Sequence, residues 1–243
     1  MSNSFFQFKQ FRIGQERCAM KVGTDGTLLG SWAALPALPA ENRRPRVLDI
    51  GTGTGLIALM MAQRCNRALV MAIDIDGDAV AQACSNVASS PFAERVEVKK
   101  IDIRCWKTEL PAMERFDAIV SNPPYFQDAL KCPDPQRSVA RHNTELTFGE
   151  LMEAAAGLLA DDGEFSLIVP SECKSLVEGN AALAGLFKSR DCVVRTTPAK
   201  NPRRCLMAFR KHPCTVETTE GVLELKPGVR SPWYEELTKD FYL

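Results

Sequence analysis

The sequence of 243 residues predicts an α/β fold, with a mostly parallel sheet covered by helices on both faces and an antiparallel C-terminal end. Two observations carry this prediction. From about residue 46 to residue 188, short apolar runs alternate with segments of helical periodicity, which is the element order of a parallel sheet. After residue 190, apolar runs follow one another across Pro- and Gly-bearing turns without a strong helix, which favours antiparallel strands.

Most of the expected strands are short runs of mainly apolar residues, as a strand covered on both faces requires. In chain order these runs lie at 47–50, 68–73, 96–101, 116–121, 163–169, 192–196, 205–210 and 222–226. The expected helices repeat apolar residues every three or four positions and lie at 56–64, 77–89, 151–159 and 171–188. No repeat or low-complexity linker interrupts the chain, so we expect one main domain at 41–243 after an N-terminal extension at 1–40.

The composition excludes several classes of protein. The 30 Lys and Arg residues balance 30 Asp and Glu residues, so any nucleic-acid site must be a local basic patch. Nine cysteines without a C-x-x-C pair, and only two histidines, argue against a metal site and a disulfide scaffold. No apolar run reaches membrane-spanning length and no signal-peptide core is present. We therefore expect a cytoplasmic protein with reduced thiols and no membrane contact.

A cluster of glycines follows the first expected strand, in the sequence DIGTGTG at 49–55. Gly51, Gly53 and Gly55 would let a ligand approach the backbone, and the next helix supplies unpaired N–H groups at its N-terminus. In an open α/β sheet, ligands bind in this crevice. The pattern G-x-G-x-x-A, completed by Ala58, is also that of dinucleotide sites, and a turn without a ligand is a further alternative. The absence of a following Gly-Lys-Ser/Thr excludes a P-loop.

Three aspartates stand at or near the ends of expected strands. Asp74 fits a carboxylate that binds both hydroxyls of a ribose, which NAD and S-adenosylmethionine (SAM) share. Asp49 would face the ammonium and sulfonium of SAM favourably and the pyrophosphate of NAD poorly, so it favours SAM as the cofactor. Asp102 fits two interpretations equally well: it could accept a hydrogen bond from an adenine amino group, or it could cap a turn.

The fourth expected strand ends in the sequence SNPPY at 121–125. An Asn-Pro turn explains part of this pattern, but the group also suits methylation of an amino nitrogen whose lone pair is delocalised. The side-chain oxygen of Asn122 and the carbonyl of Pro123 could accept the two N–H bonds and free that lone pair, since prolines fix φ and hold the carbonyl still. Tyr125 offers a face on which a planar base can stack, a contact of about 1–3 kcal/mol.

Together, the DIGTGTG and SNPPY motifs resemble those of class I SAM-dependent methyltransferases that act on amino groups. The resemblance implies a Rossmann-like fold with a mostly parallel seven-stranded sheet, and SAM as the cofactor. It implies that the catalytic residues are Asn122, Pro123, Pro124 and Tyr125. It implies that cofactor contacts come from Asp49, Gly51, Gly53, Gly55, Asp74, Asp102 and Asn122. DNA adenine, release-factor glutamine and ribosomal guanine enzymes share the tetrad, so this motif leaves the substrate open.

Further segments resemble the bacterial valine-tRNA adenine methyltransferases: FRIGQERCAMKVGTDGTLLGSW at 11–32, PQRSVAR at 135–141 and the closing FYL. This resemblance spans nearly the whole chain. It implies methylation of the exocyclic nitrogen of an adenosine beside the anticodon of a valine tRNA, with the N-terminal extension packed over the site. Lys21 and Asp25 are then expected to close over the cofactor, although Thr24 and Asp25 fit a helix N-cap equally well. We expect a monomer.

Basic residues gather in two parts of the neutral sequence. The segment 188–211 holds eight Lys and Arg residues against a single acid, and the segment 9–21 holds four against one. Such clusters could hold RNA phosphates, and a solvated basic face is the alternative. The residues that we expect to contact RNA are Arg137, Arg141, Lys200, Arg203 and Arg204.

Two other functions are compatible with the motifs. Methylation of a protein glutamine or of a ribosomal RNA guanine uses the same tetrad, but the N-terminal segment and the basic run favour tRNA. A non-catalytic SAM- or NAD-binding module that uses its basic face as an RNA adaptor is the alternative from another class. The intact tetrad argues against that alternative.

Overall fold

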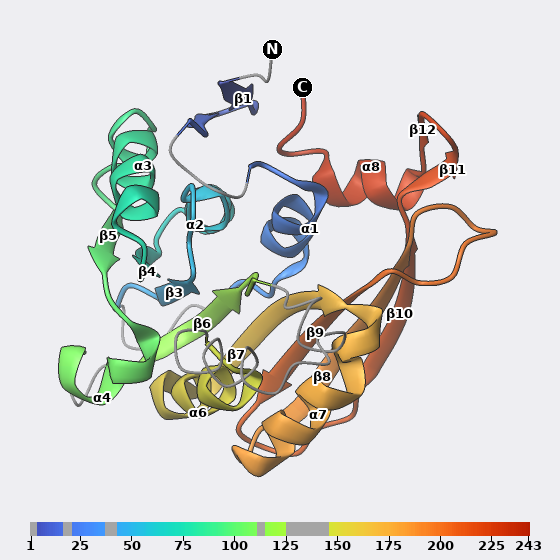
Figure 1. Ribbon diagram of the computed structural model, residues 1–243. Coiled ribbons are helices and arrows are strands. Elements are labelled where there is room, and N and C mark those ends of the chain that lie inside the picture. The colour runs from blue at the N-terminus through green and yellow to red at the C-terminus, as the bar shows by residue number, and fades with distance from the viewer. Residues whose placement is uncertain (1–3, 17–20, 37–42, 111–114, 125–145) are drawn as a thin grey trace, which may run out of the picture.

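The computed structural model describes residues 4–16, 21–36, 43–110, 115–124 and 146–243 of the chain. Its centre is an eight-stranded sheet with helices on both faces (Figure 1). Across the sheet the strands follow in the order β10 (Glu217–Val222), β8 (Phe187–Arg195), β9 (Arg204–Arg210), β7 (Leu159–Pro170), β6 (Phe116–Ser121), β3 (Arg46–Ile50), β4 (Leu69–Asp74) and β5 (Val96–Lys100). The first strand of the parallel part, β3, therefore lies inside the sheet between β4 and β6.

The strand directions confirm the predicted fold class. The strands β5, β4, β3, β6 and β7 are parallel to one another, and β9 runs antiparallel to both β7 and β8. The expected number of seven strands is wrong, because β10 pairs parallel with β8 as an additional edge strand. Its sequence, ETTEGV, is polar and mostly exposed, so apolar patterning does not reveal it.

The expected strand at 222–226 is also wrong. It is divided at Leu223, where β10 has ended and a small separate hairpin begins. In this hairpin, β11 (Glu224–Lys226) pairs antiparallel with β12 (Val229–Arg230). The apolar residues of the segment therefore belong to two sheets, which a single run of sequence does not distinguish.

The expected helix at 171–188 is shorter than predicted. One turn of 3-10 helix, η2 (Ser171–Cys173), leads into α7 (Lys174–Leu183), and β8 follows after a short turn. Gly185 ends the helix in the left-handed region, with φ of 75°, and its N–H donates to the carbonyl of Ala182 at 3.1 Å. This is a C-terminal capping motif that favours glycine, and helical periodicity alone does not show it.

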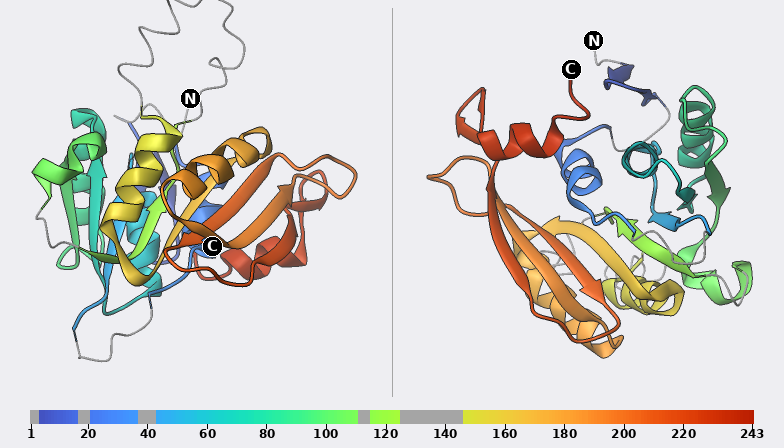
Figure 2. Two further views of the ribbon diagram at one scale, coloured as in Figure 1. Left: turned by 90° about the horizontal axis from the view of Figure 1, so that it is seen from below. Right: turned by 180° about the vertical axis from the view of Figure 1, so that it is seen from behind.

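Helices cover both faces of the sheet, as predicted (Figure 2). One core cluster joins the sheet to α1 (Thr24–Trp32), α2 (Leu56–Arg64), α3 (Gly77–Ala88) and α8 (Pro232–Thr238). A second cluster on the opposite face joins it to α4 (Trp106–Glu109), α6 (Phe148–Leu158) and α7. No helix within the described ranges is long and apolar enough to cross a membrane.

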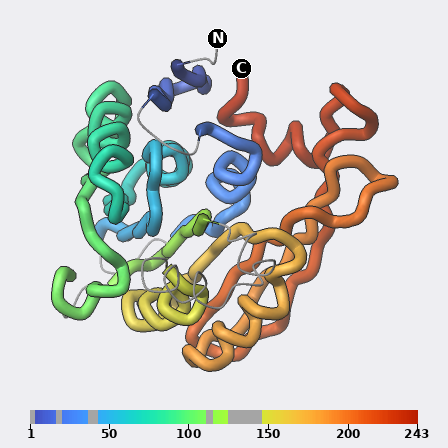
Figure 3. The backbone as a smooth tube through the Cα atoms, viewed as in Figure 1, coloured from blue at the N-terminus to red at the C-terminus, as the bar shows by residue number. Residues whose placement is uncertain are grey.

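The N-terminal segment packs against both α3 and the C-terminal residues. Its hairpin pairs β1 (Phe5–Gln7) with β2 (Arg12–Gly14). In the turn between these strands, the N–H of Lys9 donates to the carbonyl of Phe241 at 2.8 Å. The N-terminal hairpin therefore lies beside the C-terminal residues (Figure 3). Asn86 of α3 donates to the β2 carbonyl of Gly14 at 2.9 Å and to a carbonyl of the glycine loop at 2.8 Å. The extension is thereby fixed to the loop that follows β3, while its division from the main domain at residue 40 stays a prediction.

One edge of the sheet gathers the ends of three parallel strands. The last residues of β3, β4 and β6 are Ile50, Asp74 and Ser121, and the Ser121 hydroxyl donates to the Ile50 carbonyl at 2.9 Å. We call the side of the sheet where these strands end the cavity edge, and the side where they begin the far edge. Neither term refers to the outer strands β10 and β5. The strand β8 runs from the far edge to the cavity edge, and β9 returns.

Candidate cofactor and substrate cavity

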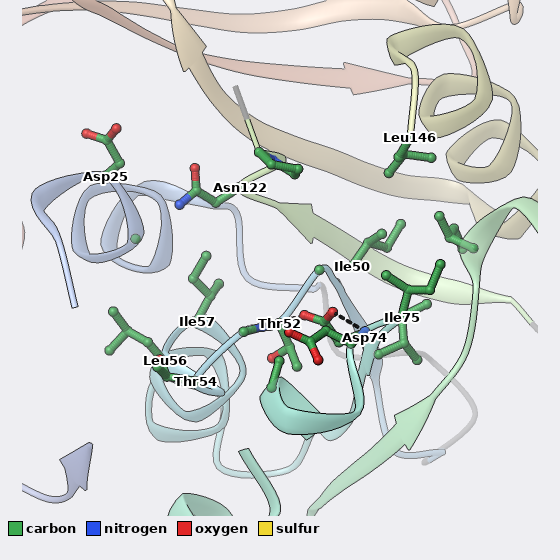
Figure 4. Close-up of a pocket in the computed structure, with 18 of the residues that line it drawn as sticks. Asp25, Ile50, Thr52, Thr54, Leu56, Ile57, Asp74, Ile75, Asn122 and Leu146 are labelled. Atoms are coloured by element: carbon green, nitrogen blue, oxygen red, sulfur yellow. Dashed lines mark hydrogen bonds between the residues drawn. The ribbon is translucent and has the colours of Figure 1, made fainter. Parts of the chain in front are cut away.

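A cavity of about 740 Å³ lies at the cavity edge (Figure 4). This volume falls within the usual range for small-ligand pockets, roughly 300–1,000 Å³. Nine of the predicted site residues line it: Lys21, Asp25, Gly51, Gly53, Asp74, Asp102, Asn122, Pro124 and Arg204. The fold therefore brings together residues from six separate parts of the sequence.

The glycine loop between β3 and α2 requires glycine for its backbone conformation. Gly51, Gly53 and Gly55 have φ of 72°, 55° and 81°, all in the left-handed region. A Cβ at Gly51 or Gly53 would meet no other described atom within 4 Å, so the space above the loop is open to a ligand. Gly55 is the N-cap of α2 and has no side chain to cap that helix.

Asp49 lies beneath the glycine loop, fully buried, and does not line the cavity. Its Oδ2 accepts from the Thr52 hydroxyl at 2.6 Å and from the Ala58 N–H at 3.1 Å, which satisfies one N–H of the first turn of α2. Its Oδ1 has no hydrogen-bond partner among the described residues. Burial raises the pKa of Asp49 from 3.8 to about 7, against the effect of the two hydrogen bonds, and the charge of Asp74 raises it further.

Asp74 lines the cavity and is held by backbone groups. Its Oδ2 accepts from the N–H of Gly53 at 2.8 Å, and its Oδ1 accepts from the N–H of Asp76 at 3.0 Å. Because a carboxylate can accept about four hydrogen bonds, both oxygens keep the capacity to accept another. The neighbouring Asp76 is the N-cap of α3, where its side chain accepts from the N–H of Asp78 at 2.9 Å.

Asp102 caps a turn, which confirms one of its two interpretations. It is the N-cap of η1 (Ile103–Cys105) and accepts from the N–H of Arg104 at 3.0 Å. The Arg104 guanidinium also donates to both carboxylate oxygens, through Nε at 3.0 Å and Nη2 at 2.7 Å. These bonds occupy about all the acceptor positions of the carboxylate. The hydrogen bonds from Arg104 hold the pKa of Asp102 below its usual value.

Helix α1 places residues 21–26 along the cavity. The helix begins at Thr24 and its N-cap is Gly23, so the N-cap interpretation of Thr24 and Asp25 is wrong. Asp25 lies in the first helical turn and forms an ion pair with Arg204, the first residue of β9. This pair joins the N-terminal extension to the antiparallel end of the sheet beside the cavity.

Two arginines that the sequence analysis missed hold the other end of α1. Arg64 donates to the carbonyls of Gly30 and Ala33 at 3.0 and 2.7 Å. Arg190 donates to the Trp32 carbonyl at 3.3 Å, and its guanidinium carbon lies 3.9 Å from the centroid of the Trp32 ring. Burial lowers the pKa of Arg64 to about 10, and the charge of Arg190 lowers it further. These partners are distant in sequence, so no local pattern indicates them.

Asn122 follows β6 directly, and its side chain extends along the cavity toward α1 (Figure 4). Pro124 also lines the cavity, whereas Pro123 is buried behind the lining residues. The structure thus brings the start of the SNPPY motif and the glycine loop to one cavity. Three predicted site residues lie outside the described residues: Tyr125, Arg137 and Arg141.

The basic segment 188–211 does not form one continuous patch. At the far edge its basic residues are in ion pairs: Lys188 with Glu178 and Asp191, Arg190 and Arg210 with Glu164, and Lys211 with Asp161. At the cavity edge, Lys200 and Arg203 are exposed, and no described acid forms an ion pair with them. The segment itself contains a single acid, but acids distant in sequence reach its basic residues at the far edge.

The sheet order, the glycine loop and the cavity at the ends of the parallel strands define a Rossmann-like class I methyltransferase. The methyltransferase small domain family matches residues 25–197. A solved structure described as a predicted O-methyltransferase from Agrobacterium tumefaciens has the same fold, with a TM-score of 0.64 and 20% identity over 89% of this chain and 96% of its own. Within the described residues, no cluster of three or more His, Cys, Asp or Glu side chains could hold a metal ion.

Curated relatives define the family more narrowly. A protein of Phocaeicola vulgatus is 49% identical over 100% of this chain and 99% of its own length. A protein of Bacteroides fragilis is 45% identical over 100% of this chain and 99% of its own length. Both are named tRNA1(Val) (adenine(37)-N6)-methyltransferase. The chain belongs to this family.

Proposed function

We propose that this protein methylates the N6 amino group of adenosine 37 in a valine tRNA, with SAM as the methyl donor. The observation that carries the proposal is the position of Asn122, which lines the same cavity as the glycine loop. Relatives that are 49% and 45% identical along the full chain support the choice of tRNA and nucleotide. Adenosine 37 lies beside the anticodon, where a base in a loop can leave its stack more easily than in a duplex.

The residues of the cavity fit SAM. The open space above Gly51 and Gly53 would accept a ligand close to the backbone. Asp74 would accept bonds from the ribose hydroxyls with its remaining capacity. When ionised, Asp49 would favour a cationic ligand above the loop, and its Oδ1 has no partner in the described part of the chain.

The other predicted cofactor contacts come from two further segments that line the cavity. From the N-terminal extension at 1–40, Lys21 and Asp25 would close over the cofactor. From the segment after β5, Asp102 would accept from the adenine amino group, for which Arg104 must release at least one acceptor position. Cofactor binding is therefore expected to change the contact between Asp102 and Arg104.

When bound, SAM supplies an electrophilic methyl group on its sulfonium. The protein must free the lone pair of the adenine amino nitrogen, which is delocalised into the ring. The Asn122 side-chain oxygen accepts one N–H bond and the Pro123 carbonyl accepts the other, while Tyr125 stacks on the base. Positioning of this kind can contribute roughly 7–11 kcal/mol. Because the amine becomes more acidic as the bond forms, its proton leaves late and neither a strong base nor a metal is needed.

Basic side chains near the cavity would hold the RNA. The residues that we propose for this role are Arg137, Arg141, Lys200, Arg203 and Arg204. Of these, Arg204 lines the cavity, and it pairs with Asp25. We further propose that the protein acts as a monomer in the cytoplasm, where its tRNA substrate is found.

Incubation with radiolabelled SAM and an unmodified valine tRNA transcript tests this function. We expect the tRNA to be labelled and nucleoside mass spectrometry to identify N6-methyladenosine. A transcript with guanosine at position 37 should remain unlabelled. Labelling of a release factor or of ribosomal RNA in place of the tRNA would contradict the proposal.

A further inference from the structure

The β11–β12 hairpin has a firmly built turn and an exposed tip. Pro227 and Gly228 occupy the turn, and Gly228 has φ of 79°. Proline followed by a left-handed glycine is the sequence of a type II turn, which fixes the backbone on both sides. The side chain of Glu224 accepts from the Gly228 N–H at 3.3 Å and closes the hairpin. Residues 225–230 are all exposed, so core packing does not account for this tip.

Backbone hydrogen bonds join this hairpin to the end of β8. The N–H of Leu223 donates to the carbonyl of Arg195 at 3.0 Å, and the N–H of Glu224 donates to the carbonyl of Thr196 at 2.9 Å. The guanidinium carbon of Arg230 lies 4.6 Å from the centroid of the Tyr242 ring, which holds the second strand. The hairpin therefore projects beside the loop at 196–203 (Figures 1 and 2).

The hairpin and the loop together carry a local positive charge on a protein of zero net charge. Segments 196–203 and 224–230 contain four basic residues and one acid: Lys200, Arg203, Lys226, Arg230 and Glu224. Where the structure describes the chain, no acid forms an ion pair with Lys200, Arg203 or Lys226. The side chains of Leu225 and Val229, 55% and 40% exposed, lie between the charges.

We propose that the β11–β12 hairpin and the loop at 196–203 form a two-part docking surface for the sugar–phosphate backbone of the substrate RNA. This inference rests on the proposed function and adds Lys226 and Arg230 to its RNA contacts. The surface begins at the cavity, because Arg204 lines the cavity and the preceding Arg203 is exposed on the loop. A nucleotide held in the cavity would thus place its neighbouring phosphates along unpaired cations.

The observations favour RNA over a protein partner. Exposed cations without acidic partners release counterions when they neutralise phosphates, which makes RNA affinity depend on salt. Rigid backbone at the hairpin tip lowers the ordering cost of each contact. The exposed Leu225 and Val229 would contact sugar and base faces and need no particular base sequence.

Binding of a valine tRNA anticodon stem-loop, measured at several salt concentrations, tests the docking surface. We compare the wild type with Lys226→Ala and with the triple variant Lys200→Ala, Arg203→Ala and Lys226→Ala. The matched control is Lys211→Ala, which removes a basic residue at the far edge that pairs with Asp161. SAM affinity serves as the folding control for every variant.

We expect the triple variant to bind the RNA about tenfold more weakly at moderate salt, and its salt slope to fall by about 1 for each lost phosphate contact. Lys226→Ala alone should lower the slope by about 1, while Lys211→Ala should keep the wild-type slope. If Lys226→Ala keeps the wild-type salt slope, the hairpin does not contact the RNA backbone and the proposal is overturned. The same result is expected if the hairpin binds an acidic protein and not RNA. If the wild type methylates the tRNA and the variants bind it as tightly as wild type, the docking surface is refuted and the proposed function stands. If the wild type methylates no tRNA, the proposed function itself fails.

Discussion

At the far edge of the sheet, Arg190 and Arg210 pair with the buried carboxylate of Glu164 at 2.6 and 3.0 Å. At the cavity edge of the same two strands, Lys200 and Arg203 form no ion pair with a described acid. The far-edge charges are thus satisfied within the fold, and Lys200 and Arg203 keep their capacity for a ligand. Arg195 and Arg204 at the same edge pair with Glu220 and Asp25. Asp49 Oδ1, also at the cavity edge, has no described partner either.

This contrast assigns different consequences to the two edges. Removing one charge of an ion pair that is buried in the fold lowers stability, because the other charge is left unpaired. A polar group that the fold does not satisfy contributes little to stability and is available for binding or chemistry. Variants at the far edge should therefore lower stability without changing the reaction. Variants of unsatisfied groups at the cavity edge should change binding or the reaction and leave stability nearly unchanged.

The largest effect is expected at the cavity edge, for Asn122→Ala. The change removes the side-chain oxygen that we propose as an acceptor for the adenine amino group. We expect turnover to fall by about 1,000-fold, the upper range for loss of one preorganised polar group in a reaction site. SAM affinity from calorimetry should stay within about threefold of wild type, and the urea midpoint should be nearly unchanged.

Two outcomes would contradict that expectation. Turnover close to the wild-type rate would remove Asn122 from the mechanism. A large fall in the urea midpoint together with the loss of turnover would show that Asn122 acts in the fold, and the contrast between the edges would fail at its most important residue.

Local sequence signals predicted much of the fold and of the cavity. Alternating apolar runs predict the parallel strands because β3, β4, β6 and β7 are largely buried on both faces. They do not reveal the edge strand β10, which is polar and mostly exposed. Gly51 and Gly53 are predicted because small residues after a strand let a ligand approach the backbone, and the structure adds that their backbone conformation requires glycine. Asn122 was predicted because its neighbours in sequence carry the same chemistry.

Groups whose role depends on distant partners could not be predicted. The sequence places Asp49 directly before the glycines, but its burial beneath them depends on the packing of α2. Arg190 reads as part of a basic run, although Glu164 and Trp32 surround it in the fold. The acids that neutralise the far edge come from β7 and α7, and sequence distance conceals them.

The second-largest effect is expected at the far edge, for Glu164→Gln. The substitution keeps the side-chain volume but leaves the guanidiniums of Arg190 and Arg210 without their shared carboxylate. Removing one partner of a buried pair costs about 3–5 kcal/mol, and because Arg210 is half-exposed we expect about 3 kcal/mol. Urea denaturation measures this loss, and turnover per folded molecule should be unchanged.

The control for Glu164→Gln is Asp161→Asn, which removes an acid that is 85% exposed and pairs with Lys211 at 3.4 Å. An exposed ion pair contributes about 0–1 kcal/mol, so this variant should be nearly as stable as wild type. Equal losses in the two variants would show that burial of Glu164 does not govern the far edge.

The third prediction concerns the pH dependence of stability and the variant Asp49→Asn. The pKa of Asp49 is about 7 in the fold against an ordinary 3.8, so the folded state holds the proton more tightly than the unfolded state. The stability that protonated Asp49 contributes is fully present below about pH 4 and is lost as the pH rises through about 7. From about pH 5 to about pH 7, Asp49→Asn should therefore gain about 2 kcal/mol of stability relative to wild type.

Urea denaturation of both proteins across this pH range measures the effect, and the difference should level off above about pH 8. A constant difference would show that Asp49 does not titrate in the fold. SAM affinity over the same pH range tests the role of the ionised carboxylate. An affinity that rises with pH in the wild type, while its stability falls, and that does not rise in Asp49→Asn would support the proposed effect of Asp49 on the cofactor.

The smallest predicted effect separates two neighbouring acids, both of which line the cavity. Asp74→Ala removes the proposed acceptor of the ribose hydroxyls and should weaken SAM binding about tenfold, in the range of a hydrogen bond to a charged group. Asp76→Ala removes the N-cap of α3 and should lower stability by about 1 kcal/mol with unchanged SAM affinity. Calorimetry and urea denaturation of the two variants distinguish these roles. If only Asp76→Ala weakens SAM binding, the ribose contact belongs to Asp76 and not to Asp74. Asp76 would then both cap α3 and bind the ligand at the cavity edge.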